Sequence, residues 1–180
     1  MKEMTYADIF ISILNKYQPD ASAWIKGNSD NPNLSGLVNF YNTPFGGIII
    51  NAEIYGLPDS MTATRGNLTP NSPNMDSVQD IPSKYFGMHI HEFGDCTLPF
   101  DKTGNHYNPN NTEHPKHAGD LPPLLSNNGY AWLSFYTKRL SIKDIIGKSV
   151  VIHSLRDDFT SQPAGDSGVK IGCGVITASK

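Results

Sequence analysis

The sequence predicts an all-β fold, an antiparallel β-sandwich or barrel, on three observations. Short stretches with the alternation of a half-buried strand recur along the chain, and residues that favour turns separate them. Glycine (16 residues) and proline (13 residues) are frequent, which suits many short elements joined by turns. No helical periodicity extends beyond the N-terminal segment of this 180-residue chain. These features are typical of a sandwich or barrel rather than of a helical bundle.

Seven stretches of the chain are expected to form strands. The turn-prone sequence SDNPN separates the first stretch from the second, and the fifth follows NNG at 127–129, which is typical of a tight hairpin turn. The expected strands are residues 21–27, 34–43, 47–57, 85–92, 130–136, 148–153 and 171–178.

The chain divides into a short N-terminal segment, residues 1–18, and one domain, residues 19–180. The segment carries a cluster of apolar residues that favours a short helix. It lacks a basic start, its apolar run is short and Asp8 stands at its edge, so a signal peptide is not expected. We therefore expect a cytoplasmic protein as the sequence is written, or a secreted or cell-envelope protein if the chain has been trimmed.

Three stretches are expected to be irregular. Residues 58–84 are polar and rich in Pro, Ser, Asn and Thr, which is typical of a surface insertion. Residues 93–128 form a long loop, and residues 154–172 form another that ends at Cys173. Long loops in compact domains are usually functional or disordered, and the histidines within 93–128 favour function.

Charge and hydropathy exclude two classes of partner. The formal net charge is −3, whereas a nucleic-acid binder normally presents a basic face. No apolar run is long enough to span a bilayer, and no basic amphipathic stretch suggests a membrane surface. We expect neither nucleic acid nor membrane as a partner.

The two cysteines, Cys96 and Cys173, permit two interpretations. Two reduced, buried thiols are common in cytosolic proteins. A single disulfide that fastens the long loop to a late strand is the alternative, and the residues alone leave both open.

The six histidines give the strongest functional signal. His89 and His91 stand two apart on an expected strand, so their imidazoles share one face, and His153 ends another expected strand. The loop adds His106, His114, His117 and Asp120, with the spacing H-x7-H-x2-H-x2-D. Three imidazoles and one carboxylate make a complete tetrahedral set for zinc, which indicates a structural site. The histidines on the strands would then hold the reactive metal.

Several segments together resemble the signature segments of the copper-zinc superoxide dismutase family, in the arrangement of its bacterial members. They occur in the family's order, and the resemblance covers about half of the chain. The segments are GMHIHEFGDC (87–96), GNHYNP (104–109), HAGDLP (117–122), VVIH (150–153) and GCGVI (172–176). The resemblance implies a Greek-key β-sandwich or barrel of about eight strands, with long metal-binding loops.

The resemblance also implies a role for each site residue. Copper would be bound by His89, His91, His106 and His153, and zinc by His106, His114, His117 and Asp120. His106 would bridge the two metals, and Asp157 would hydrogen-bond to His89 and His114 from outside the ligand set. Cys96 and Cys173 would form a disulfide.

The activity implied by the resemblance is the dismutation of superoxide through a copper ion, with homodimers common in the family. The expected catalytic residues are His106, which would take up and deliver a proton, and Lys170. Lys170 stands where the family usually has an arginine beside the copper. A lysine keeps the positive charge that attracts a small anion but lacks the planar fork of donors.

Two other functions compete with a dismutase. Cupins also carry an HxH pair on a β-barrel strand, around a single metal, but a cupin would leave the histidines of the loop unexplained. A dismutase-like protein that binds copper and zinc with little or no turnover is the second alternative. Lys170 and the short metal-binding loops keep that alternative open.

Overall fold

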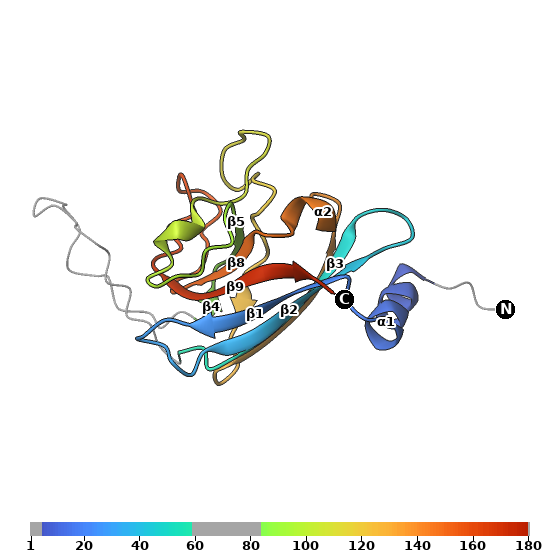
Figure 1. The fold of residues 1–180 in the computed structure, drawn as a ribbon, viewed down its shortest axis with the longest axis horizontal. Helices are drawn as coiled ribbons and strands as arrows, with labels where there is room; N and C mark the ends of the chain where they lie inside the picture. The colour runs from blue at the N-terminus through green and yellow to red at the C-terminus, as the bar shows by residue number, and fades with distance from the viewer. Residues whose placement is uncertain (1–4, 59–83, 180) are drawn as a thin grey trace, which may run out of the picture.

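The computed structural model describes residues 5–58 and 84–179, and it is an all-β protein with a short N-terminal helix (Figure 1). The helices are α1 (Tyr6–Lys16), the four-residue α2 (Ile142–Ile145) and the 3-10 helix η2 (Asp101–Thr103). The strands are β1 (Ala21–Gly27), β2 (Ser35–Asn42), β3 (Ile48–Tyr55), β4 (Tyr85–Phe86), β5 (Met88–His91), β6 (Leu124–Leu125), β7 (Tyr130–Thr137), β8 (Ser149–His153) and β9 (Lys170–Ala178).

Seven of these strands form one curled antiparallel sheet, in the order β5-β8-β9-β1-β2-β3-β7. β4 pairs with β6 in a separate two-stranded ladder. The tight turn expected at 127–129 joins β6 to β7, with Asn128 and Gly129 at φ of 53° and 81°. These two positive φ values are those of a hairpin turn that matches the twist of its strands.

One face of the curled sheet encloses the hydrophobic core. On β5 and β8, Met88, Ile90, Val150 and Ile152 point into this core and are fully buried. Because side chains alternate along a strand, the residues between them lie on the opposite face. This alternation places His89, His91 and His153 together on the outer face of the β5–β8 pair.

α1 packs on the outer face of the sheet, far from η2 in Figure 1. Thr5 and Asp8 form a capping box at its start, which satisfies backbone N–H groups of the first turn. Ile13 then packs on Tyr41 of β2 and Ile49 of β3. The expected short N-terminal helix is therefore confirmed. No helix in the described ranges is long and apolar enough to cross a membrane.

The seven expected strands are all present, with two differences. Residues 85–92 form two strands, β4 and β5, because the chain leaves the main sheet before Gly87 and pairs with β6. β6 was not predicted, since two residues carry no periodicity. The surface insertion expected at 58–84 lies, for residues 59–83, outside the described residues.

Candidate metal centre

The strands β5 and β8 position three histidines. His89 pairs with Val151 and His91 with Ser149, while the N–H of His153 donates to the carbonyl of Gly87 at 2.8 Å. All three imidazoles therefore emerge from adjacent points on one face of the sheet.

The long loop after β5 folds back along the free edge of that strand. The N–H of Tyr107 donates to the carbonyl of Ile90 at 2.7 Å, and the N–H of Ile90 donates to the carbonyl of Gly119 at 2.9 Å. These bonds set His106 opposite His91 and Asp120 opposite His89. Backbone pairing thus brings the loop ligands onto the face that carries the strand histidines.

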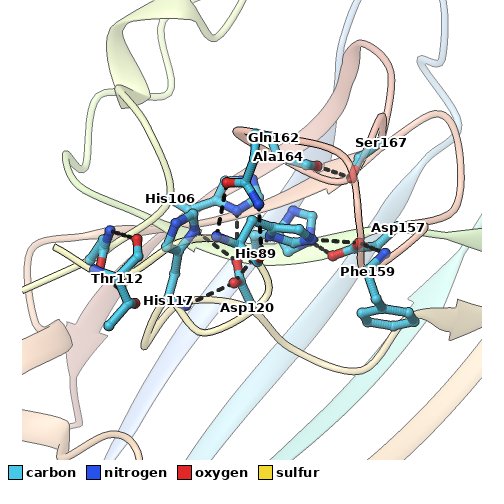
Figure 2. A network of polar contacts seen from close by, with 12 residues as sticks. His89, His106, Thr112, His117, Asp120, Asp157, Phe159, Gln162, Ala164 and Ser167 are labelled. Carbon is cyan, nitrogen blue, oxygen red and sulfur yellow. Dashed lines mark hydrogen bonds and ion pairs between the residues drawn. The ribbon is translucent and has the colours of Figure 1, made fainter. Parts of the chain in front are cut away.

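Two groups of side chains result, and each keeps its ligand atoms within 4.8 Å of one another. The four-histidine group is His89, His91, His106 and His153, and the mixed group is His106, His114, His117 and Asp120. Every member is buried, with at most 7% of its surface exposed. Figure 2 shows His89, His106, His117 and Asp120 converging. His106 belongs to both groups, so one imidazole joins the two sites.

Hydrogen bonds fix the tautomers in the four-histidine group. His91 Nδ1 lies 2.9 Å from the carbonyl of Gly104, and His153 Nδ1 lies 3.3 Å from the carbonyl of Gly168. A carbonyl only accepts, so each Nδ1 carries the proton and each Nε2 keeps a lone pair. Yet His91 Nε2 and His153 Nε2 face each other at 3.2 Å. Two lone pairs at this distance repel unless a cation lies between them.

Unpaired nitrogens mark the same two groups. Of the five buried side-chain polar atoms without a hydrogen-bond partner in the described residues, four belong to these histidines: His89 Nδ1, His106 Nε2, His114 Nδ1 and His117 Nδ1. Buried polar atoms are normally paired, so their concentration here requires an explanation. Metal coordination supplies one, because imidazole lone pairs are good ligands for both copper and zinc.

The mixed group surrounds one carboxylate with three ring nitrogens. The Nδ1 atoms of His106, His114 and His117 lie 2.7, 3.1 and 3.3 Å from oxygens of Asp120. His114 cannot donate from Nδ1, because its proton is held on Nε2 by Asp157. Three imidazoles and a carboxylate leave no open position, which fits a structural zinc ion.

Asp157 connects the two groups from outside. Its Oδ2 accepts from His89 Nε2 (Figure 2), and its Oδ1 accepts from His114 Nε2, both at 2.9 Å. Both bonds leave Nδ1 of the histidine free to bind a metal. Burial alone would raise the pKa of Asp157, but hydrogen bonds from His89, the N–H of Phe159 and His114 hold it below its ordinary value.

Burial also keeps the strand histidines neutral. It lowers the pKa of His89 to about 4, although the hydrogen bond with Asp157 acts in the opposite direction. Burial likewise lowers the pKa of His91 and of His153 well below the ordinary value. Neutral imidazole is the form that binds a metal.

Lys170, which the family resemblance assigned to the copper site, lies beside the four-histidine group. It pairs with His153 in the β8–β9 ladder. Its ammonium donates to the carbonyl of Gly104 at 3.1 Å, and Gly104 is also the partner of His91. Burial lowers the pKa of Lys170, and the charge of Asp101 opposes that shift.

The expected disulfide is present between Cys96 and Cys173, with 5.7 Å between the Cα atoms. It packs with Phe100 and Val151 on the outer face of the sheet. The bond therefore ties the long loop to β9, close to the metal centre.

Other supporting residues were not predicted from the sequence. Gln162 accepts from the N–H of His114 at 3.1 Å and donates to its carbonyl at 2.8 Å. A guanidinium N–H of Arg139 donates to the carbonyl of His117. Gly165, with φ of 67°, allows its loop to pass close to Asp157 and His114. No motif surrounds these residues, so the sequence held no signal for them.

A family model described as copper/zinc superoxide dismutase (SODC) matches residues 34–176, which is more than half of the chain. The chain belongs to the copper/zinc superoxide dismutase family. Similar proteins include the "Superoxide dismutase [Cu-Zn]" of Cryptococcus neoformans, 38% identical over 109 residues, and that of Deinococcus radiodurans, 36% identical over 123 residues. These matches cover 52% and 56% of this chain, and 71% and 68% of the relatives.

The "Extracellular superoxide dismutase [Cu-Zn]" of Mus musculus is 36% identical over 101 residues, 51% of this chain and 40% of that protein. The chain thus spans less than half of the mouse protein. A cupin would use a single metal, and this would not account for the mixed group. The six histidines, with Asp120, Asp157 and Lys170, lie together as the resemblance to copper/zinc superoxide dismutases implied.

Proposed function

We propose that this chain is a copper/zinc superoxide dismutase. Two superoxide ions and two protons would give one dioxygen and one hydrogen peroxide. The observation that carries the proposal is the single imidazole of His106, shared by a four-histidine group and a closed mixed group. A buried pair of sites joined in this way fits two different metals held close together.

His89 Nδ1, His91 Nε2, His106 Nε2 and His153 Nε2 would hold copper. His106 Nδ1, His114 Nδ1, His117 Nδ1 and Asp120 would hold zinc. Copper would supply the electron transfer, accepting one electron from a first superoxide and returning it to a second. Zinc would order the loop, because its four protein ligands leave no position for substrate.

The residues around the site contribute orientation, charge and a proton. Asp157 keeps the rings of His89 and His114 turned so that Nδ1 faces the metal. Lys170 places a positive charge beside the site, which attracts a small anion. His106 Nε2, when it is not coordinated, can hold one of the two protons that leave with the peroxide.

The decay of superoxide, followed directly by its absorbance, tests this proposal. Protein loaded with one copper and one zinc should accelerate the decay, and the metal-free protein should not. His153→Ala should abolish the acceleration while the protein still binds zinc, which shows that it remains folded. Rapid decay catalysed by the metal-free protein would contradict the proposed chemistry.

The alternative without turnover makes a different prediction. Decay near the background rate, despite confirmed metal loading, would favour a protein that binds copper and zinc without catalysis. Lys170→Arg should then be tested, because it restores the planar donor group at this position.

We also propose a homodimer, as the family resemblance suggests. An exposed patch with two tryptophans supports it: Trp24 and Trp132 are 70% and 59% exposed and lie in one row across β1, β2, β3 and β7, with Leu37 and Glu53 between them. These are the only tryptophans of the chain. Sedimentation velocity, with tryptophan emission followed over the same range of concentration, tests whether the patch becomes buried.

A further inference from the structure

The ammonium of Lys170 has three acceptors, and all of them come from the segment before His106. Its Nζ lies 2.8 Å from the hydroxyl of Thr103, 3.1 Å from the carbonyl of Gly104 and 3.4 Å from the carbonyl of Phe100. The shortest contact is therefore with a side chain rather than with the backbone. A lysine ammonium has three hydrogens, so each can point at one of these acceptors.

Thr103 is arranged to accept from Lys170. The residue has no exposed surface, and its hydroxyl lies 2.8 Å from the carbonyl of Phe100. That carbonyl can only accept, so the hydroxyl donates to it and turns its lone pairs toward the ammonium. The chain of bonds runs from Lys170 through Thr103 to Phe100.

We propose that Thr103 is a positioning residue that fixes the charge of Lys170 beside the four-histidine group. This inference rests on the proposed function, because that charge would act on an anion approaching the copper ligands. The Thr103 hydroxyl also lies 3.5 Å from His91 Nδ1, so its test must separate an effect through Lys170 from one through that ring.

A positioning residue is needed because the lysine side chain is flexible. Lysine is a point charge on a flexible four-carbon stem, whereas arginine is a rigid planar fork. The exposed Asp101 attracts Lys170 through its negative charge and offers an alternative partner. The hydroxyl of Thr103 holds the ammonium at the Gly104 carbonyl, where its charge lies near His91.

This arrangement also limits how Lys170 recognises an anion. With its three hydrogens committed to protein acceptors, the ammonium attracts the anion by charge and has no spare N–H to donate. Lys170 would therefore act on an anion through its charge rather than through a directed N–H bond.

The experiment measures anion binding without turnover. Azide is titrated into copper- and zinc-loaded protein, and its dissociation constant is read from the visible absorbance of the copper. Thr103→Val, which removes only the hydroxyl, should raise that constant about three- to tenfold, as expected when a nearby charge moves away by a few ångströms. Thr103→Ser keeps the hydroxyl and should restore the wild-type value.

The Lys170→Met background separates positioning from a structural role. If Thr103 acts through Lys170, Thr103→Val should change azide binding in the wild type and have no further effect in Lys170→Met. An equal effect in both backgrounds, or none in the wild type, would overturn the proposal.

A second measurement needs no metal. Acetylation of Lys170 in the metal-free protein, followed by mass spectrometry, should be faster in Thr103→Val than in the wild type or in Thr103→Ser. If Thr103→Val fails to fold, Thr103→Ala takes its place in both measurements. Unchanged acetylation would contradict the positioning role. If azide binding and acetylation change as expected but the loaded protein does not turn over superoxide, only the proposed function is contradicted.

Discussion

Asp157 is the residue whose replacement should affect both proposed metals at once. Each carboxylate oxygen of Asp157 accepts from one ring, and asparagine replaces one of these oxygens with an NH2 group that only donates, so the bond to His89 or to His114 is lost. One of the two rings must then move its proton to Nδ1, the atom that faces the metal. Because His106 belongs to both groups, the disturbance of one group also reaches the other. We expect Asp157→Asn to weaken copper and zinc binding, each about 10- to 100-fold. Competition with chelators of known affinity measures both.

Asp158 provides the matched control for this prediction. It is the adjacent acid, and it accepts from the N–H groups of Thr160 and Ser161 within its own turn. Asp158→Asn should leave both metal affinities unchanged. A loss confined to one metal in Asp157→Asn would show that Asp157 does not couple the two groups.

The ligands were predictable from the sequence, while the partners that orient them were only partly so. Histidine is rare and its spacing is informative, so the six rings stand out, and family resemblance added Asp157 and Lys170. The acceptors of His91 and His153 are the backbone carbonyls of Gly104 and Gly168. Every residue has a carbonyl, so no sequence pattern identifies the ones that fix a tautomer.

The loop between β8 and β9 contacts the site from outside the ligand set, and a substitution in this loop tests whether that contact matters for metal binding. An added Cβ at Gly165 would lie 2.0 Å from Asp157 Oδ1 and 2.7 Å from His114 Nε2. We expect Gly165→Ala to displace this loop and to lower zinc affinity at least about tenfold, as the loss of a partner outside the ligand set does. Isothermal titration with zinc measures the change.

Gly46→Ala separates the effect of contact from that of backbone strain. Gly46 has φ of 80° and Gly165 has φ of 67°, so alanine is strained at both positions, by about 1 kcal/mol or more. A Cβ at Gly46 would meet nothing within 4 Å. Gly46→Ala should therefore destabilise the protein and leave zinc affinity unchanged. Equal losses of zinc affinity in the two variants would contradict the contact explanation.

At the scale of elements, periodicity predicted the strands of the main sheet and missed the short pieces around it. β1 spans the residues expected, because alternation over seven residues is a clear signal. β6 follows Pro122 and Pro123 and has two residues, and its pairing with β4 depends on how the whole loop is placed. This pairing depends on tertiary contacts, which the local sequence pattern does not reveal.

Across the whole molecule, the disulfide between Cys96 and Cys173 closes a loop with a sequence separation of 77. A cross-link over such a distance restricts the unfolded chain strongly. We expect the double variant Cys96→Ser with Cys173→Ser to lose about 2–4 kcal/mol in the free energy of unfolding of the metal-free protein. Urea denaturation measures this, and the wild type under reducing conditions should match the variant. A variant as stable as the oxidised wild type would show that the bond does not stabilise the fold.

The stability of the whole metal-free protein should also fall in mildly acidic solution. An imidazole in the unfolded chain takes up a proton near pH 6.5, whereas burial lowers the pKa of His89 to about 4. Between these values the unfolded state binds more protons, so acidification favours unfolding. His89 alone would cost roughly 3 kcal/mol over this window, and the lowered pKa values of His91 and His153 extend the loss to lower pH.

Urea denaturation of the metal-free protein at several pH values between 7.5 and 4.5 measures this dependence. The free energy of unfolding should decline steadily below pH 6.5, before the carboxyls of Asp120 and Asp157 titrate, because their pKa values lie below the ordinary 3.8. A flat profile between pH 6.5 and 4.5 would show that the histidines are not held neutral by burial. In the loaded protein, protons would compete with the metals for the same nitrogens, so metal release should precede unfolding in this window.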